Sequence, residues 1–234
     1  MKYKRILLKI SGEVLGGAHG DWVDPDALDE VCDEIEGVVK KGIQVAIVVG
    51  GGNFWRYRDN KSMVLSRSTS DALGMMATMM NARLLEETLQ RRGIKVKALA
   101  AHGQPYFVDD YSPEKGKDLL ATKTVVVLGG GTGNPYFTTD TAAALRALEL
   151  DCNVLLKSTK VDGIYDSDPV KNKKAKFFES ITYDEVLKRK LEVMDLSSIL
   201  LCKENNLPVH VFSGQKKGNL LKVVTGKKLG SLIF

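Results

Sequence analysis

The chain has 234 residues, 44% of them hydrophobic and 27% charged, which is ordinary for a globular protein. Residues 1–5 are charged and run straight into an apolar segment, and no apolar run is long enough to span a bilayer, so neither a signal peptide nor a membrane protein is expected. The net charge of +5 comes from 34 basic and 29 acidic residues. No aromatic residues alternate with the lysine clusters, so a solvated surface is favoured over a nucleic-acid site.

The cysteines and histidines do not have the spacing of metal ligands. Cys32, Cys152 and Cys202 are far apart in the chain and form no CxxC pair, which indicates buried free thiols in a reducing compartment. The three histidines also lack ligand spacing, so no metal site is expected. We therefore expect a cytoplasmic protein. Since the chain contains no linker and no internal repeat, we expect one domain over residues 1–234.

Short apolar runs rich in Val, Ile and Leu recur along the chain, and continuous runs of this kind are typical of strands buried on both faces. The predicted strands are residues 6–10, 43–49, 96–100, 125–128, 154–156 and 209–212.

Amphipathic stretches lie between these runs. Asp24 followed by Pro25 is a good helix start, and this helix is predicted to continue to about Lys41. Further helices are predicted over residues 70–92 and from near Thr139, Thr182 and Asp195. Strands that alternate with helices predict an α/β fold, a three-layer αβα sandwich around a central, mainly parallel sheet.

Glycine-rich turns follow three of the predicted strands, at residues 11–12, 50–53 and 129–135. In a parallel sheet these strand ends lie at one edge, where ligands bind. Glycine lets backbone N–H groups approach an anion closely, so the three turns together indicate a phosphate site. The chain contains neither the P-loop motif nor the dinucleotide-binding glycine motif, so the phosphate chemistry needs another scaffold.

Two charged segments adjoin these turns. Lys9 ends the first strand, where its ammonium group could neutralise phosphate oxygens during transfer. Residues 157–169 follow the fifth predicted strand and combine lysines, hydroxyls and an aromatic side chain that could hold a nucleotide. The Asp-Gly and Asp-Pro pairs in this segment are equally ordinary turn signals, so its role stays open on the residues alone.

These segments resemble the amino-acid-kinase superfamily and, within it, the bacterial uridylate kinases. The resemblance runs from residue 3 to about residue 233 and is carried by KRILLKISGE (4–13), VVGGGNFWR (48–56), GTGNPYFTTDTAA (131–143), LLKSTKVDGIY (155–165) and EVMDLSS (192–198). It implies reversible phosphoryl transfer from ATP to UMP, giving UDP and ADP, in pyrimidine nucleotide (CTP/UTP) biosynthesis. It also implies a homohexamer and Mg²⁺ that enters with ATP, without metal ligands from the chain itself.

The resemblance also implies roles for individual residues. The implied ATP-binding residues are Lys9, Ile10, Ser11, Gly12, Gly52, Arg56, Thr159, Tyr165 and Asp168. The implied UMP-binding residues are Gly51, Asp71, Thr132, Gly133, Asn134, Pro135, Tyr136, Phe137, Thr138 and Thr139. The implied catalytic residues are Lys9, Arg56, Asp140 and Lys160.

Two other functions are kept as alternatives. One is a kinase of the same superfamily that acts on acetylglutamate, carbamate or aspartate. The other is a nucleotide-binding storage or regulatory protein that kept the fold and lost the activity. Lys9, Arg56, Asp71 and Asp140 are all present, which disfavours the inactive relative.

Overall fold

The computed structural model describes residues 2–17, 21–57, 59 and 63–234, and its main feature is one nine-stranded sheet. Its strands are β1 (Arg5–Ile10), β2 (Gln44–Val49), β3 (Val96–Ala100), β4 (Asp109–Asp110), β5 (Val125–Gly129), β6 (Val154–Thr159), β9 (Ser180–Ile181), β10 (Val209–Ser213) and β11 (Ser231–Ile233). The strand order is β4-β3-β5-β2-β1-β6-β10-β11-β9, and every neighbouring pair is parallel except β10 with β11. A separate antiparallel hairpin pairs β7 (Ile164–Tyr165) with β8 (Phe177–Phe178).

The six strands predicted from apolar runs are confirmed, with ends that differ by up to three residues. They occupy the middle of the sheet, where strands are covered on both faces and therefore need apolar side chains on both. The strands that the sequence did not reveal are two or three residues long, too short for a recognisable pattern.

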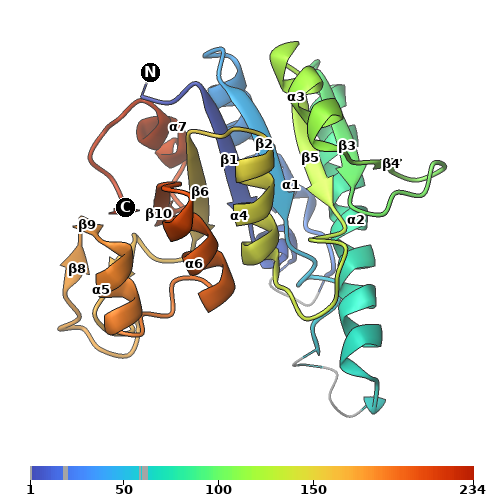
Figure 1. Ribbon diagram of the computed structural model, residues 1–234. Coiled ribbons are helices and arrows are strands. Elements are labelled where there is room, and N and C mark those ends of the chain that lie inside the picture. The colour runs from blue at the N-terminus through green and yellow to red at the C-terminus, as the bar shows by residue number, and fades with distance from the viewer. Residues whose placement is uncertain (1, 18–20, 58, 60–62) are drawn as a thin grey trace.

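Helices cover both faces of the sheet, which makes the predicted three layers (Figure 1). On one face lie α1 (Pro25–Val39), α2 (Arg67–Arg91) and α7 (Asn219–Val224), whose apolar residues share a core with Ile6 and Leu8 of β1. On the other lie α3 (Pro113–Ala121), α4 (Thr139–Glu149), α5 (Tyr183–Lys188) and α6 (Leu196–Glu204), which share a second core with Leu7. Successive strand residues thus point into different cores.

Most helix starts follow the local signals in the sequence. Asp24 caps α1 by accepting hydrogen bonds from the first turn, and Thr182 caps α5 by accepting from the Glu185 amide. Helix α2 begins at Arg67 with Ser66 as its cap, three residues before the expected start. The prediction missed α3 and α7, which have only nine and six residues and are shorter than the stretch over which a helical period is recognised.

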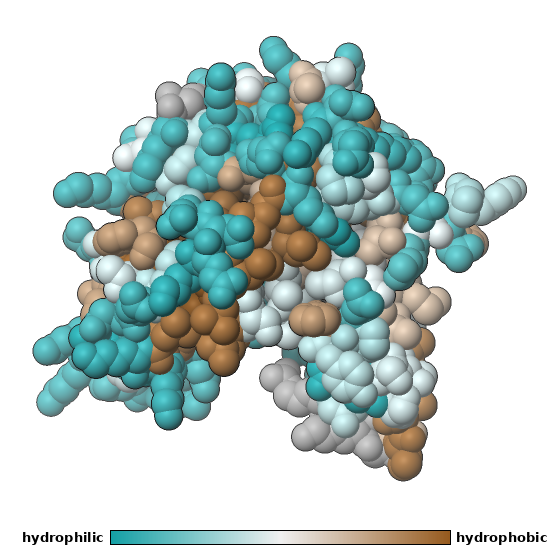
Figure 2. Space-filling view, viewed as in Figure 1, coloured by the Kyte–Doolittle hydropathy of each residue, from teal (hydrophilic) through white to brown (hydrophobic). Residues whose placement is uncertain are grey.

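The carboxyl ends of the parallel strands face the lower edge of the sheet in Figure 1. In the same view, the surface is hollowed at this edge, between the lobe that carries α5 and α6 and the lower end of α2 (Figure 2). The glycine-rich turns that follow β1, β2 and β5 lie at these strand ends. No helix in the described part of the chain is long and apolar enough to cross a membrane.

A buried histidine makes the stability of this fold sensitive to pH. His210 of β10 is 7% exposed, and its Nδ1 atom has no hydrogen-bond partner among the described residues. Burial lowers the pKa of His210, although its Nε2 hydrogen bond to the Leu229 carbonyl opposes the shift. Because unfolding lets the ring take up a proton, the stability that the neutral ring supports is lost as the pH falls below the ordinary histidine value of 6.5.

We therefore expect the free energy of unfolding to fall between pH 7.5 and 5.5, with His210 contributing at most about 1.4 kcal/mol per pH unit. The substitution His210→Gln removes the titration, so its unfolding free energy, measured by urea denaturation, should fall less over this range. His102→Gln, at an exposed position, is the matched control for the substitution itself. Equal slopes for wild type and H210Q would contradict this prediction.

Candidate active site

Two lysines and one aspartate form a buried charged centre at the carboxyl edge of the sheet. Lys9 of β1 and Lys157 of β6 are direct partners in the strand register, and both point toward the face covered by α4. Asp140 lies in the first turn of α4, with its Oδ1 atom 2.8 Å from Lys9 Nζ and its Oδ2 atom 2.6 Å from Lys157 Nζ. All three side chains are at most 14% exposed. One carboxylate therefore holds two ammonium groups side by side.

The protonation of this centre follows from its burial and its charges. Burial raises the pKa of Asp140, but the ammonium groups of Lys9 and Lys157 outweigh this and hold the pKa below its usual value. Burial lowers the pKa of Lys157, an effect that Asp140 opposes and Lys9 reinforces. The aspartate is therefore ionised at neutral pH and acts as an anchor for the cations rather than as a proton acceptor.

The first two glycine turns touch each other through their backbones. A Cβ atom added at Gly12 would lie 2.5 Å from the Gly50 carbonyl oxygen, so only glycine fits. Asn81 of α2, which is fully buried, donates to that same carbonyl at 2.7 Å and pairs with the side chain of Asn53. Asn81 thus ties the turn after β2 to α2, a role that no local pattern in the sequence indicates.

Two of the predicted catalytic cations meet at one half-buried carboxylate. Glu13, in the short 3-10 helix η1 (Gly12–Leu15), lies 3.1 Å from Arg56 Nη2 and 3.1 Å from Lys160 Nζ. Arg56 Nε also donates to the Gly52 carbonyl at 2.7 Å. An oxygen anion is thus already held between Arg56 and Lys160, next to the first two glycine turns. The second lysine at Asp140, besides Lys9, is Lys157. The sequence placed Lys157 in the segment 157–169 but not among the catalytic residues, whereas the predicted Lys160 lies at Glu13.

The third glycine turn leads into a loop fixed by side chains from several helices. Thr78 of α2 accepts from the Gly130 amide at 2.8 Å, and buried Arg146 of α4 donates to the Gly131 carbonyl at 3.2 Å. The Asp71 carboxylate accepts from the Tyr136 amide at 2.8 Å and from Arg67 Nε at 2.8 and 2.9 Å. The loop is therefore connected to α2 at two places, Asp71 and Thr78, as well as to α4.

A cavity of about 330 Å³ lies between this loop, α2 and the turn after β2. Of the residues predicted to bind UMP, those that line it are Gly51, Asp71, Thr132, Asn134, Phe137, Thr138 and Thr139. Gly133, Pro135 and Tyr136 belong to the same loop without lining the cavity. Trp55, Tyr57 and Arg67 also line it, and the Arg67 guanidinium lies 5.0 Å from the centre of the Tyr57 ring. The pocket thus combines aromatic walls with one carboxylate.

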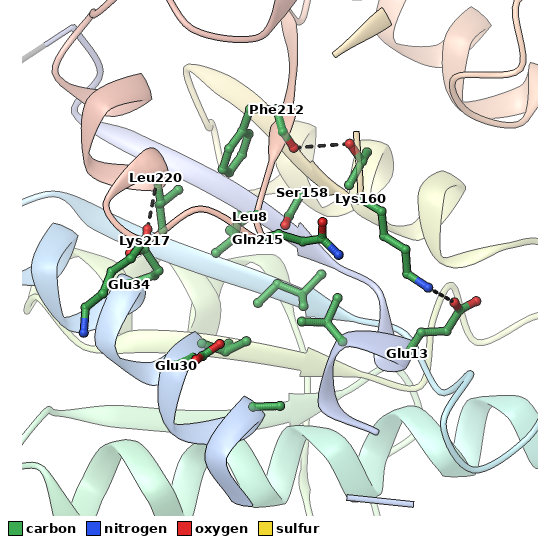
Figure 3. A pocket seen from close by; sticks show the side chains of 16 residues that line it. Leu8, Glu13, Glu30, Glu34, Ser158, Lys160, Phe212, Gln215, Lys217 and Leu220 are labelled. Carbon is green, nitrogen blue, oxygen red and sulfur yellow. Dashed lines mark hydrogen bonds and ion pairs between the residues drawn. The ribbon is translucent and has the colours of Figure 1, made fainter. Parts of the chain in front are cut away.

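A larger cavity, of about 460 Å³, opens beside Glu13 and Lys160 (Figure 3). Its floor is apolar and includes Leu8, Phe212 and Leu220, which belong to the core on the α1 and α7 face. Ile10 and Thr159, two of the predicted ATP-binding residues, also line it.

Two other predicted ATP-binding residues lie in or after the β7 strand, away from this lining. Tyr165 packs edge-on against Phe177 across the hairpin, at 5.3 Å between ring centres. Asp168 accepts from the Val170 amide at 2.9 Å. The residues predicted for ATP are thus spread over the β1 end, the β2 turn, the β6 end and the hairpin.

Comparison with known proteins identifies the family. A family model described as "Amino acid kinase family" matches residues 4–213. The chain belongs to this family. It is 47% identical to a uridylate kinase of Ectopseudomonas mendocina and 46% identical to one of Pseudomonas aeruginosa, and the alignments cover 99% of this chain and 94–95% of theirs.

Solved structures give the same result. The fold matches a UMP kinase of Bacillus anthracis with a TM-score of 0.97 and 31% identity, over all of this chain and 96% of that one. It matches a UMP kinase of Ureaplasma parvum with a TM-score of 0.94 and 36% identity, over all of this chain and 99% of that one. The predicted amino-acid-kinase-like fold and the resemblance to uridylate kinases are confirmed, and the chain is a kinase of this group.

The stability of the protein and its turnover should both depend on the charge of Asp140. In Asp140→Asn, two buried ammonium groups lose their shared counter-charge, so the free energy of unfolding should fall by about 3–5 kcal/mol. The turnover number should fall by roughly a hundredfold or more, because the lysines no longer keep their positions. Urea unfolding and initial rates measure the two effects.

A second substitution separates charge from packing. Adding Lys157→Met to D140N removes one of the two repelling ammonium groups and should restore part of the stability without restoring turnover. A D140N variant as stable as wild type would show that Asp140 does not anchor the two lysines.

Proposed function

We propose that this kinase transfers the terminal phosphoryl group of ATP to UMP, giving UDP and ADP, as a step in the formation of UTP and CTP. The observation that carries the proposal is the 330 Å³ cavity, where Asp71 faces the loop 131–139 and where the lining residues Thr138 and Thr139 directly precede Asp140 of the charged centre. The names of the similar proteins, uridylate kinase and UMP kinase, support the same substrate.

The acceptor cavity has the chemistry that a pyrimidine nucleotide needs. The Asp71 carboxylate can accept hydrogen bonds from the two ribose hydroxyls. Thr132 and Asn134 offer donors and acceptors that can read the edge of uracil, next to aromatic walls that can cover its ring. Thr138 and Thr139 lie at the amino end of α4, where backbone N–H groups and the helix dipole favour a phosphate.

The donor side is assigned to the residues around the first two glycine turns. We propose that Lys9, Ser11 and Gly12, with Gly52 and Arg56, hold the phosphates of ATP. Arg56 and Lys160 already hold the Glu13 carboxylate, and they would exchange it for phosphate oxygens. Ile10, Thr159, Tyr165 and Asp168 are assigned to the rest of ATP.

The transfer itself is proposed to be direct. An oxygen of the UMP phosphate forms a bond to the γ-phosphorus of ATP while the bond from that phosphorus to the β–γ bridging oxygen breaks, and ADP leaves with the electron pair. The attacking oxygen is already anionic at neutral pH, so no general base is required. Lys9 and Lys157, kept in place by Asp140, neutralise the charge that develops on the transferring group.

Mg²⁺ is proposed to enter as the complex with ATP. In the described part of the chain no group of three or more His, Cys, Asp or Glu side chains could hold a metal ion, and the carboxylates nearest the centre already pair with cations. The ion therefore fits best as a ligand of the ATP phosphates and water, where it would neutralise phosphate charge.

One assay separates the candidate functions. Purified protein is mixed with Mg-ATP and UMP, CMP, dUMP, acetylglutamate, carbamate or aspartate, and the formation of ADP and of the phosphorylated acceptor is followed. We expect rapid turnover with UMP. Turnover with an amino acid or carbamate alone would replace the proposal with another kinase of the family, and ATP binding without any turnover would favour an inactive relative.

Asp71 should matter for one substrate only. In Asp71→Ala the ribose hydroxyls lose their acceptor, so the KM for UMP should rise by roughly tenfold to a hundredfold. The KM for ATP should stay within about threefold, because Asp71 lines the 330 Å³ cavity and Lys160 lines the other one. Steady-state kinetics with each substrate varied in turn measures the difference. Equal effects on the KM values of both substrates would show that Asp71 does not bind the UMP ribose.

We also propose that the chain forms a homohexamer in the cytoplasm. Met76 and Met80 are 60% and 49% exposed, one turn apart on α2, and offer an apolar surface to a second copy. The three free cysteines suit a reducing compartment. Light scattering should give a mass near six chains for wild type and a smaller one for Met76→Glu, whereas a monomeric wild type would exclude the hexamer.

A further inference from the structure

The segment 192–198, which leads into α6 and includes its first residues, touches the charged centre although no role has been assigned to it. We call this segment the strap. The Val193 carbonyl oxygen accepts a hydrogen bond from Lys157 Nζ at 2.5 Å. Two residues later, Asp195 is the N-cap of α6 and reaches across to the first turn of α4. The strap therefore contacts both elements that supply the Lys157–Asp140 pair.

The Asp195 carboxylate accepts three hydrogen bonds, and only one of them belongs to capping. Its Oδ1 atom accepts from the Ser198 amide at 2.8 Å, which is the ordinary N-cap interaction. The same atom accepts from the Thr141 hydroxyl at 2.9 Å, and Oδ2 accepts from the Thr138 hydroxyl. These two threonines are more than fifty residues away in the chain, on both sides of Asp140.

The direction of these hydrogen bonds fixes the start of α4. Because the Thr138 hydroxyl gives its proton to Asp195, its oxygen lone pairs are free to accept from the Asp140 amide, at 3.0 Å. Thr138 thus caps α4 in an orientation set by Asp195. The residue whose amide donates to Thr138 is the one whose carboxylate pairs with Lys9 and Lys157.

We propose that Asp195 is a positioning residue for phosphoryl transfer. It contacts no substrate atom itself and holds the first turn of α4 so that Asp140, Thr138 and Lys157 keep their relative places. Val193, in the same strap, accepts a hydrogen bond from Lys157, so the strap holds both Lys157 and the helix turn that carries Asp140. This inference rests on the proposed function, since it concerns the geometry of that reaction.

The alternative is that Asp195 merely caps α6. Asp, Asn and Ser are about equally good N-cap residues, so substitution among them leaves the cap almost unchanged. Asn keeps one acceptor oxygen, but the NH2 group that replaces the other oxygen cannot accept the Thr138 proton. Ser is too short to reach either threonine and cap the helix as well. If Asp195 only caps α6, wild type and the Asn and Ser variants should have similar turnover numbers. If Asp195 is a positioning residue, the turnover number should fall from wild type to Asn and again from Asn to Ser.

The experiment measures turnover in wild type, Asp195→Asn and Asp195→Ser. We expect the turnover number to fall severalfold in D195N and roughly tenfold to a hundredfold in D195S, as for a small misplacement of catalytic groups. The KM for ATP should change by less than about threefold, because no residue of the strap lines the 460 Å³ cavity that holds Ile10 and Thr159. The matched control is Asp24→Ser, the same substitution at the N-cap of α1, whose carboxylate accepts from the Asp26 and Ala27 amides of its own turn.

A double-mutant cycle tests the route through threonine. Thr141→Val removes one hydroxyl contact without touching the cap of α6, and it should lower turnover a few-fold on its own. Combined with D195S it should cost nothing further, because the contact is already lost. Additive effects, or a D195S enzyme within twofold of wild type, would overturn the proposal.

Hydrogen exchange gives a readout that does not depend on the reaction. The amides of residues 140–142 should exchange about tenfold faster in D195S than in wild type or D24S. If wild type fails to phosphorylate UMP, the proposed function fails, while exchange in this turn still decides whether Asp195 holds α4. Unchanged exchange in D195S would overturn the inference even in an enzyme that is fully active on UMP. If D195S does not fold, D195N and T141V give the same comparison.

Discussion

The rest of the site depends on one constraint. The sheet places two ammonium groups next to each other, and one carboxylate balances their charge. The strand register places Lys9 and Lys157 directly opposite each other on neighbouring strands, about 5 Å apart at their backbones, in a nearly dry environment. Two like charges at this separation repel strongly unless a counter-charge lies between them. Asp140 supplies that charge, so the start of α4 has to be held as firmly as the strands themselves.

Helix α2 organises the other half of the site. Its buried side presents Thr78 and Asn81, which hold the turns after β5 and β2, while Asp71 and Arg67 near its start face the acceptor cavity. One rigid element thus sets the distance between the turn assigned to the donor phosphates and the loop assigned to the acceptor. A single helix can thus align both substrates, which matters because direct transfer between two nucleotides depends mainly on their mutual position.

The parts of the structure that could be predicted from the sequence are those determined by local pattern. Continuous apolar runs located the central strands, and the glycine turns with Lys9 located the edge where the site lies. The sequence does not reveal whether Lys157 or Lys160 meets Asp140, because that depends on β6 ending at Thr159 and on which face each side chain takes. Asn81 and Asp195 act through contacts with residues far away in the chain, and neither belongs to a motif that local spacing could expose.

The contact between Gly12 and Gly50 has a consequence for how the sequence of this chain can vary. A side chain at Gly12 would strike the Gly50 carbonyl, and one at Gly50 would come within 2.9 Å of the Gly12 nitrogen. Each residue thus collides with the backbone of the other rather than with its side chain, so no replacement at one position can make room for a substitution at the other. Each of the two positions therefore requires glycine whatever residue stands at the other, and sequence variation in this part of the chain is confined to the neighbouring residues.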